Sequence, residues 1–525
     1  MNPDLPPQVD LAIIGGGING AGLAALAAHS GLSVALLEKD DFASGTSSKS
    51  TKLIHGGIRY LELANFALVF EALHERSHLL RLAPHLVRPL AFLLPVYQGD
   101  KRPAWMLKMG LWLYDLLAGI HNIRRHQWFS APETLAFAPN LRAEGLKGCG
   151  LYYDAQVNDA RLVLENILSA EQAGAWCLNY HEVLAVKNEG GDQAELLLRD
   201  RSTGESRRLK ASCLVNAAGP WANRVHSLLA PQGKPLVRPT RGSHLVVDQV
   251  LPDKALLITT RGDNRVIFVI PWRGYSLVGT TDLDDEGDPD KTAPTEEEIR
   301  YLLGEASRLF PGQSWDRAKV LAAFSGLRPL AWTEKGSASS VSREDRFLIE
   351  GKCVTIVGGK LTTYRAMARK ALKACARILN RPLKPLPFSL PGAPQTPWED
   401  FEKASLAQWP ERYGIHPEQA AHLARLYGQK AQSVLELTLA DPALKEKLDE
   451  SRPEILAQVV YAVREEKAVH LGDVMLRRLE IGYTPARLGS APEKASRLLA
   501  QLLHWDEPRR QKELADYQTF LFPRP

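Results

Sequence analysis

One short stretch of the chain gathers several side chains that can do chemistry. Residues 47–62, SSKSTKLIHGGIRYLE, hold hydroxyls, three cations, one histidine and a pair of glycines. Such a mixture suits a solvated loop, a phosphate cradle or part of an active site. The elements that surround the stretch must decide between these three.

A glycine-rich motif lies upstream of this stretch. Gly15, Gly17 and Gly20 form the pattern G-x-G-x-x-G directly after the apolar run VDLAII of residues 9–14. The run is short and rich in β-branched residues, which predicts a buried parallel strand. Residues 18–31 are small and predict a helix that ends at a glycine, and residues 33–37 predict a second strand. Together these elements predict a βαβ unit.

The motif predicts binding of a dinucleotide. Its glycines allow a tight turn, a close approach to a pyrophosphate and tight packing of helix on strand. The pyrophosphate would lie at the helix N-terminus. Glu38 follows the second strand, eighteen residues after Gly20, and is placed to bond ribose hydroxyls. An acid there disfavours NADP, and the alternatives of FAD, NAD and a purely structural glycine turn remain.

Other segments are expected to join this unit from far along the chain. Residues 214–216 and 354–357 predict buried strands that end on small residues, and both could extend the first sheet. Residues 44–52, 216–221 and 358–363 would then converge on one long cofactor. Residues 245–247, 266–270 and 276–278 predict an antiparallel sheet.

The C-terminal part differs in composition from the rest. Residues 382–397 contain six prolines, which predicts an extended linker, and residues 398–525 have a helical pattern. A chain of 525 residues is also long for one core. We therefore expect two or three lobes, of which the last is helical.

Composition excludes several classes of protein. The net charge of +5 is too mild, and the cations too scattered, to favour nucleic acid, but it is compatible with small anions or an anionic membrane surface. Five cysteines without a C-x-x-C pair give no zinc or iron–sulfur motif and suit a reducing compartment. The N-terminus lacks the regions of a signal peptide, and no apolar run reaches the about 20 residues of a membrane span. We expect a cytoplasmic chain without a metal site.

Several longer motifs give the sequence a specific resemblance. IIGGGINGAGLA, TSSKSTKLIHGGIRYLE, NAAGPWAN, RGSHLVV, FVIPW, GTTD, SGLRPL and GGKLTTYR occur in this order. In these motifs the chain resembles the FAD-dependent, quinone-linked glycerol-3-phosphate dehydrogenases. The resemblance implies an α/β fold with a Rossmann-like FAD-binding domain of the D-amino-acid oxidase type, a mixed-sheet substrate domain and an α-helical C-terminal domain. The first two would interleave over residues 1–390, with the FAD part near 1–60, 150–225 and 340–380.

The same resemblance implies an activity. The chain would oxidise sn-glycerol 3-phosphate to dihydroxyacetone phosphate through non-covalent FAD and pass electrons to a membrane quinone. It would then work at the cytoplasmic face of the inner membrane, and a homodimer is one expected assembly. The alternatives are a glycerophosphate oxidase that uses O2, an amine or amino-acid oxidase on the same fold, and a non-catalytic flavin-binding protein.

The matched motifs imply roles for particular residues. Guanidinium groups bind phosphate with two hydrogen bonds, so Arg328, Arg343 and Arg59 are expected at the substrate, together with Tyr60 and Lys360. His55 and His244 compete as the base, although proton transfer assisted by an arginine alone remains an alternative. The residues expected at FAD are Gly15, Gly17, Asn19, Gly20, Glu38, Ser47, Ser48, Lys52, His55, Gly219, Gly359, Lys360, Leu361, Thr362 and Thr363.

A segment for the membrane is also expected, because a quinone is dissolved in lipid. On a helix over residues 101–117, Lys101, Lys108 and Asp115 would form a narrow polar stripe. A broad apolar face would carry Trp105, Met109, Trp112, Leu113 and Leu116. Such a helix suits the plane of a membrane interface, but a helix buried in the substrate domain fits the pattern equally well.

Overall fold

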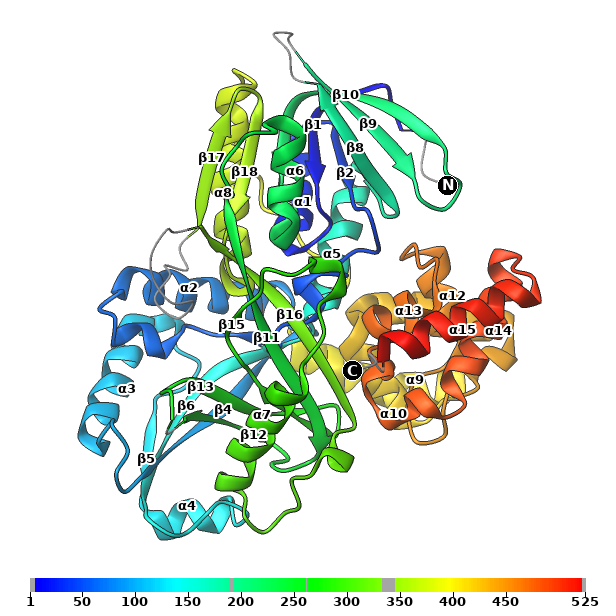
Figure 1. Cartoon of the computed structure of the whole chain (residues 1–525). Helices are drawn as coiled ribbons and strands as arrows, with labels where there is room; N and C mark the ends of the chain where they lie inside the picture. The colour runs from blue at the N-terminus through cyan, green and yellow to red at the C-terminus, as the bar shows by residue number, and fades with distance from the viewer. Residues whose placement is uncertain (1–4, 188–192, 261, 333–344, 522–525) are drawn as a thin grey trace.

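The computed structural model of the chain describes residues 5–187, 193–260, 262–332 and 345–521. Figure 1 shows a first sheet layer with its helices at the top, a second sheet below it, and a group of helices beside both. No helix within these ranges is long and apolar enough to cross a membrane.

The first sheet is mainly parallel and is built from distant parts of the chain. Its strand order is β17-β18-β10-β1-β2-β7. In this order β18, β10, β1, β2 and β7 run parallel to one another, and β17 is antiparallel to β18. The two predicted strands that end on small residues thus join the first sheet, as β10 and β18. The bounds are β1 Gln8–Ile14, β2 Val34–Leu37, β7 Trp176–Leu178, β10 Ser206–Asn216, β17 Arg346–Glu350 and β18 Cys353–Val357.

Alternation along β1 explains how this sheet is covered. Leu11 and Ile13 face a cluster that includes helices α1 (Ile18–His29), α5 (Asp159–Gln172) and α8 (Tyr364–Ile378). Ala12 and Ile14 face the opposite cluster, under β8 (His181–Lys187), β9 (Ala194–Asp200) and α6 (Ala222–Leu229). Successive side chains of a strand point to opposite faces, so both faces of β1 are buried.

The second sheet is mixed, with mostly antiparallel neighbours. Its order is β15-β11-β14-β13-β12-β4-β6-β3, with β16 on β11 and β5 on β6. The predicted antiparallel strands are confirmed as β11, β13 and β14. The strand bounds are β3 Leu53–Ile54, β4 Val87–Tyr97, β5 Gln127–Phe129, β6 Leu146–Val157, β11 Val237–Asp248, β12 Lys254–Thr259, β13 Val266–Trp272, β14 Tyr275–Gly279, β15 Leu283–Asp284 and β16 Ala322–Ala331. The helices of this part are α2 Phe66–Leu82, α3 Ala104–Ala118, α4 Ala131–Phe137 and α7 Glu296–Leu309.

The proline-rich segment forms neither helix nor strand, as its prolines predict. Its second half is not a free spacer, however. Leu390 is buried, and the backbone N–H of Gly392 donates to Glu165 Oε2 (2.7 Å). The linker is therefore fixed against α5 before the helical part begins.

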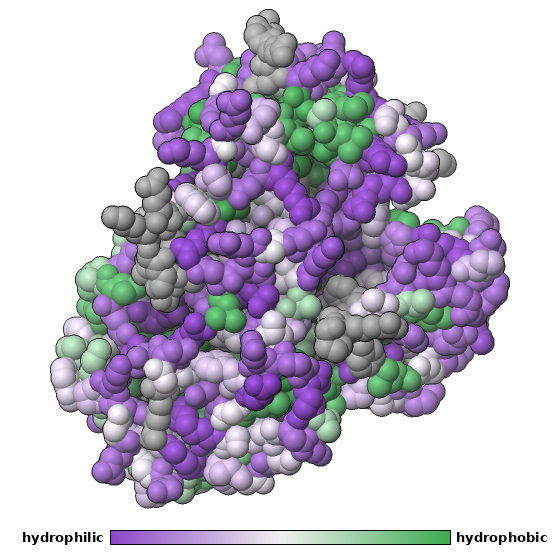
Figure 2. All heavy atoms as spheres, viewed as in Figure 1, coloured by the Kyte–Doolittle hydropathy of each residue, from purple (hydrophilic) through white to green (hydrophobic). Residues whose placement is uncertain are grey.

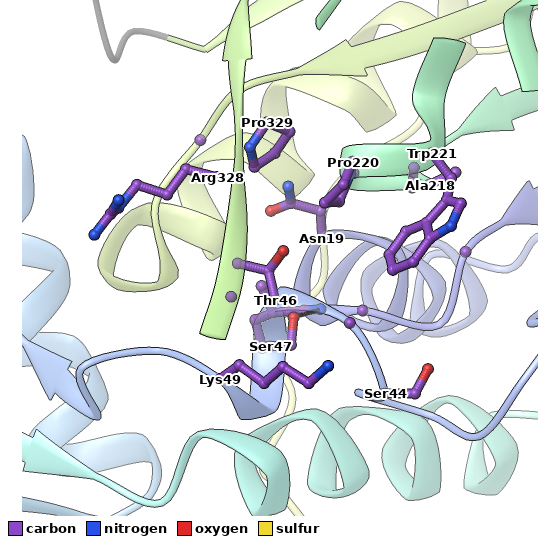
Figure 3. Close-up of a pocket in the computed structure, with 18 of the residues that line it drawn as sticks. Asn19, Ser44, Thr46, Ser47, Lys49, Ala218, Pro220, Trp221, Arg328 and Pro329 are labelled. Atoms are coloured by element: carbon purple, nitrogen blue, oxygen red, sulfur yellow. Dashed lines mark hydrogen bonds between the residues drawn. The ribbon is translucent and has the colours of Figure 1, made fainter. Parts of the chain in front are cut away.

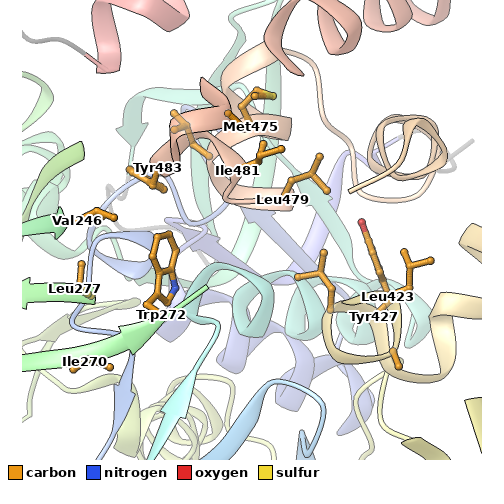
Figure 4. Packing of buried hydrophobic residues seen from close by; sticks show 14 of the residues in the cluster. Val246, Ile270, Trp272, Leu277, Leu423, Tyr427, Met475, Leu479, Ile481 and Tyr483 are labelled. Atoms are coloured by element: carbon orange, nitrogen blue, oxygen red, sulfur yellow. The ribbon is translucent and has the colours of Figure 1, made fainter. Parts of the chain in front are cut away.

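The helical C-terminal part is confirmed, and it shares a core with the second sheet. In Figure 4, Tyr483, Ile481 and Met475 lie over Trp272 and Val246. The ring of Tyr483 is 6.3 Å from that of Trp272 and 5.2 Å from that of Phe324. The helices are α9 Trp398–Tyr413, α10 Pro417–Tyr427, α11 Ala431–Ala440, α12 Leu456–Arg464, α13 Leu471–Asp473, α14 Ala491–Leu503 and α15 Glu507–Leu521.

Candidate active site

A hollow of about 840 Å³ lies where the two sheets meet. The carboxyl ends of β1, β2, β10 and β18 open into it, which is the usual place for a ligand in a parallel sheet. Figure 3 shows Asn19 and Trp221 on one side, Arg328 on another, and Thr46, Ser47 and Lys49 across the floor. The hollow is long enough to bring the glycine motif and the expected substrate residues into one site.

The glycine motif packs as its pattern predicts. Gly15 has φ +114°, a value that favours glycine, and a Cβ there would lie 2.6 Å from Ala217 O. A Cβ at Gly20 would lie 1.9 Å from Gly15 O, so this glycine allows α1 to approach β1 but does not itself line the hollow. Gly17 does line it and precedes α1. The N-terminus of α1 therefore faces the hollow, where it can bind a pyrophosphate.

Glu38 and Asn19 line the hollow at the glycine motif. The carboxylate of Glu38 accepts the backbone N–H groups of Gly16 (2.7 Å) and Asp40 (2.9 Å). Burial raises the pKa of Glu38 to about 7. The side-chain oxygen of Asn19 is buried without a hydrogen-bond partner in the described part of the chain. A buried acceptor of this kind calls for a donor from a ligand.

Ser47 closes the glycine motif from the other side, as expected. Its Oγ accepts the backbone N–H of Ile18 (3.0 Å) at the start of α1, and the residue lines the hollow. It belongs to the short 3₁₀ turn η1, Thr46–Ser48. The turn sends alternate side chains in different directions, and Ser48 is buried away from the hollow.

The expectation that Lys52 faces the cofactor needs correction. Lys52 is fully buried and does not line the hollow. Its ammonium contacts Asp159 Oδ1 (2.7 Å) and Glu480 Oε1 (2.6 Å), and these carboxylates outweigh burial and raise its pKa above the ordinary lysine value. Lys49 takes the place expected of Lys52, because it lines the hollow and burial lowers its pKa to about 8.

His55 lies at the end of β3 and lines the hollow. Its backbone N–H donates to Thr362 Oγ1 (3.1 Å), and its ring lies 6.3 Å from that of Phe268. Two distant segments therefore fix its position. The neighbouring glycines serve packing within the protein, because a Cβ on Gly56 would lie 2.3 Å from the Tyr114 hydroxyl and one on Gly57 2.5 Å from the Tyr60 ring.

His244 also lines the hollow, on β11, but its surroundings differ from those of His55. The ring stacks on Phe324 at 5.1 Å, and Nε2 lies 3.0 Å from Thr51 Oγ1. Burial, aided by the cations Arg328 and Lys52, lowers the pKa of His244 to about 3. A histidine with so low a pKa stays neutral and is a weak proton acceptor.

Arg328 projects into the hollow from β16. Its Nη1 donates to Asp282 Oδ1 (3.1 Å) and its Nη2 to Thr280 Oγ1 (3.0 Å). These contacts come from the loop after β14 and hold the guanidinium in place. A planar guanidinium so fixed can bind a phosphate with two hydrogen bonds.

Lys360 follows β18 and also lines the hollow. Its Nζ lies 3.9 Å from the centre of the Tyr60 ring, and Tyr60 lines the same hollow. Arg59 lines a neighbouring hollow instead, although its guanidinium lies 5.5 Å from the centre of the Tyr60 ring. Arg343 lies outside the described residues.

Of the other residues expected at the cofactor, four line the hollow and one is buried away from it. Gly219, Gly359, Leu361 and Thr362 line the hollow, whereas Thr363 is buried at the start of α8. Neither Thr362 nor Thr363 caps that helix through its side chain, since Thr362 reaches the backbone of His55. The side chains of these two threonines therefore do not act as caps of α8.

The sequence did not single out three further residues at this site, although two of them, Thr51 and Trp221, lie in segments expected to converge on the cofactor. Thr51, Trp221 and Asp290 line the hollow beside Lys49. Asp290 accepts from Trp221 Nε1 (2.8 Å) and also pairs with Lys39, so a loop of the second sheet closes onto the first. Thr51 and Lys49 lie in the stretch of residues 47–62, but the tertiary fold and not the sequence shows that both face the hollow.

Known proteins share this architecture. A family model described as FAD dependent oxidoreductase matches residues 10–364, and one described as C-terminal domain of alpha-glycerophosphate oxidase matches residues 387–510. The glycerol-3-phosphate dehydrogenase of Synechocystis sp. is 37% identical over 98% of this chain and 96% of its own. The chain belongs to the FAD-dependent glycerol-3-phosphate dehydrogenase family.

Further family members support the match along the whole chain. The mitochondrial glycerol-3-phosphate dehydrogenase of Homo sapiens is 34% identical over 98% of this chain and 73% of its own length. The FAD-complexed structure of the Bacillus halodurans enzyme aligns with a TM-score of 0.82 at 29% identity, covering 98% of this chain and 95% of that one. An L-alpha-glycerophosphate oxidase from Mycoplasma pneumoniae shares the fold, with a TM-score of 0.57 at 22% identity, and covers 73% of this chain and 97% of its own.

The hollow fits the FAD that this family binds. The start of α1 and Ser47 would hold the pyrophosphate, and Glu38 the ribose. His55, Arg328 and Lys360 would surround the reactive end. When bound, the flavin supplies an acceptor for a hydride, while the protein binds and orients the substrate and moves its proton.

Proposed function

We propose that this member of the family oxidises sn-glycerol 3-phosphate at C2 to dihydroxyacetone phosphate. The observation that carries the proposal is the presence of Arg328, Lys360 and His55 on one hollow with the glycine motif. Oxidation of a phosphorylated secondary alcohol needs an anion clamp, a base and a hydride acceptor, and this hollow supplies the first two beside a site for the third. The names of the relatives support the same substrate.

Each of these side chains has a proposed task. Arg328 binds the substrate phosphate through two charge-assisted hydrogen bonds and fixes the far end of the three-carbon chain. His55 accepts the proton of the C2 hydroxyl, because His244 is neutral and poorly basic. Lys360 adds positive charge where negative charge develops during the reaction.

We further propose that the electrons leave through a membrane quinone. Support comes from α3, which carries Trp105, Met109, Trp112 and Leu116 on its outer face, each more than half exposed. An exposed apolar helix face of this kind, with Lys101 and Lys108 exposed beside it, suits a lipid interface. Figure 2 shows apolar spheres at the left edge, where Figure 1 places α2 and α3.

The face also extends beyond α3. Leu63, Phe66 and Phe70 near the start of α2, and Ile120 after α3, are exposed as well. Contiguous apolar surface of this extent marks an interaction site. In the proposed location the protein rests on the cytoplasmic face of the inner membrane, and its assembly into a homodimer stays a prediction.

One experiment tests the substrate directly. The FAD-loaded protein is mixed anaerobically with sn-glycerol 3-phosphate, and the visible absorbance of oxidised flavin is followed. Bleaching by this substrate, but not by glycerol or by amino acids, is the expected result. Absorbance that persists with sn-glycerol 3-phosphate but disappears with dithionite would contradict the proposed substrate. Peroxide formed in air at the rate of substrate oxidation would favour the oxidase alternative.

A further inference from the structure

A loop of the second sheet crosses to the first sheet and closes against it. We call residues 285–295 the strap, because they join β15 to α7. One end is anchored where Arg241 Nη1 donates to Asp285 Oδ2 (2.8 Å). The other end is anchored where Thr295 Oγ1 accepts the backbone N–H of Glu298 (3.3 Å) at the start of α7. The strap therefore leaves the second sheet and returns to it, with its middle part facing the first sheet.

The middle of the strap is held by side chains of the first sheet layer. Asp290 accepts hydrogen bonds from Trp221 Nε1 (2.8 Å) and Arg224 Nη1 (2.7 Å), and it also pairs with the Lys39 ammonium. Asp288 accepts from Arg224 Nη2 (2.5 Å). Lys39 follows β2, and Trp221 and Arg224 follow β10. One carboxylate thus joins the strap to the ends of two strands of the first sheet.

This contact lies at the rim of the hollow of the candidate active site. All four of its side chains line that hollow, namely Lys39, Trp221, Arg224 and Asp290. The side chains of Arg224 and Asp290 are also 51% and 39% exposed, so they stand between the hollow and solvent. Lys39 is adjacent to Glu38, the residue expected at the ribose, and Figure 3 shows Trp221 on the side away from Arg328. The strap therefore covers the end of the hollow that fits the adenosine part of FAD.

The middle of the strap is held less firmly than its anchor at Asp285. Burial alone would raise the pKa of Asp290, but hydrogen bonds from Lys39 and Arg224 lower it, so the carboxylate is charged at neutral pH. Ion pairs that face solvent contribute little each and are screened by salt. Arg241 and Asp285 are only 19% and 12% exposed, which protects their pair from this screening. The middle can therefore open while the anchor stays in place.

We propose that the strap is a gate for FAD, which opens at Asp290 whenever the cofactor enters or leaves the hollow. The hollow extends from the glycine motif to His55 and Lys360, and the strap crosses the seam between the two sheets above it. Asp290 pairs with protein groups, so opening costs the same free energy in the free and the loaded protein. Such a gate slows uptake and release by the same factor and leaves the equilibrium affinity for FAD unchanged. The inference concerns the cofactor alone and does not depend on the proposed substrate.

Asp290→Ala tests the gate, because it removes the contacts in the middle of the strap and keeps both anchors. The variant should release FAD about tenfold faster than the wild type, with an unchanged Kd for FAD. Asp290→Asn keeps an acceptor for Trp221 but loses the charge, and it should accelerate release to a smaller degree. The matched control is Asp253→Ala, because Asp253 pairs with Lys254 (2.6 Å) and does not line the hollow.

Release is measured on the holoenzyme, without any assay of activity. Bound FAD is exchanged for an excess of 5-deaza-FAD, which has a different absorbance, and the Kd is obtained from the FAD that stays bound on dilution. Added salt should speed the exchange in the wild type more than in Asp290→Ala, because only the wild type has the ion pairs at Asp290 to lose. The midpoint of thermal unfolding should be the same in all four proteins.

Different failures have different meanings. Release at the wild-type rate in both Asp290 variants would overturn the gate. Faster release with a Kd weakened by the same factor would also overturn it, because Asp290 would then hold the bound cofactor instead of closing its path. Faster release together with a lowered unfolding midpoint would show a general structural role. The proposed function fails by a separate result, which is flavin absorbance that persists with sn-glycerol 3-phosphate.

Discussion

The Lys52 ammonium lies 2.6 Å from the Glu480 carboxylate, although 428 residues separate the two in the chain. Both side chains are buried, and Asp159 contacts the same ammonium at 2.7 Å. Glu480 also accepts from Asn158 Nδ2 (3.0 Å). The helical C-terminal part therefore fixes the segment that carries Ser47 and His55. A second contact joins the same parts of the chain, because Tyr483 packs on Phe324, and Phe324 in turn stacks on His244.

Lys52→Met is expected to destabilise the protein strongly. The substitution leaves Asp159 and Glu480 buried together without their shared cation, and breaking such a buried pair costs about 3–5 kcal/mol. FAD should also be released more readily, because Ser47 lies in the same segment. The midpoint of thermal unfolding and the flavin retained on gel filtration measure the two effects.

The control for this variant is Lys512→Met. Lys512 pairs with Asp516 on α15, but the two side chains are 62% and 59% exposed. Exposed pairs contribute little, so the change should stay within about 0.5 kcal/mol. Equal effects of the two substitutions would contradict a structural role for the buried pair.

The range of each interaction decides what the sequence could reveal. The βαβ unit and its glycine motif are local, and the strands that extend the first sheet end on recognisable small residues, so these features could be predicted. The role of Lys52 could not be, because its partners lie 107 and 428 residues away. Without them, a cation three residues from Lys49 is equally suited to the cofactor.

Some site residues could likewise be predicted from local motifs, whereas the properties of others depend on contacts between distant segments. Arg328 and Lys360 could be found from their motifs, and the structure brings both to one hollow. The low pKa of His244 depends on burial between β11 and β16 and on cations from other segments. Asp290 lies in an ordinary polar loop, and only the tertiary fold shows that it reaches Trp221.

Arg328→Gln tests the phosphate clamp. The variant loses the charge-assisted hydrogen bonds to phosphate. The transition-state stabilisation calculated from kcat/KM for sn-glycerol 3-phosphate should therefore fall by about 2–4 kcal/mol, and FAD should be retained. The preference for this substrate over unphosphorylated glycerol should shrink by the same factor. Steady-state kinetics with a soluble dye measure both.

Arg317→Gln is the matched control for the clamp. Arg317 pairs with Glu296, and both side chains are more than half exposed. Its removal should leave the kinetics unchanged. An Arg328 variant that loses activity equally toward both substrates would indicate a general disturbance of the site rather than loss of a phosphate contact.

His244 should make the folded protein sensitive to acid. Its pKa is about 3 in the folded state against an ordinary value of 6.5. Between these values the unfolded chain binds a proton that the native state does not, so the histidine lowers the free energy of unfolding as the pH falls from 6.5 toward 3. His244→Gln removes this effect, and its unfolding midpoint should decline less steeply with acid than that of the wild type.

A second buried histidine provides an internal comparison. Burial lowers the pKa of His422 to about 4. The pH range over which this histidine lowers the free energy of unfolding is therefore narrower than that of His244. His422→Gln should reduce the acid sensitivity between pH 6.5 and 4 and leave the slope below that range unchanged. Curves of unfolding midpoint against pH that run parallel for wild type and His244→Gln would contradict the low pKa.

The outer face of α3 should control binding to lipid. Replacing Trp105, Trp112 and Leu116 together by serine removes exposed apolar side chains and leaves the buried residues Leu111 and Tyr114 in place. Binding to anionic vesicles, measured by co-sedimentation, should weaken about tenfold or more, since it scales with the apolar area inserted. Reduction of a soluble dye should remain at the wild-type level.

The control replaces Leu439 and Leu488, which are 54% and 70% exposed in the C-terminal part. These leucines are about as exposed as the three residues replaced on α3, but they lie outside the apolar face of that helix. If both sets of substitutions weaken vesicle binding equally, general hydrophobicity drives it, and α3 has no special role.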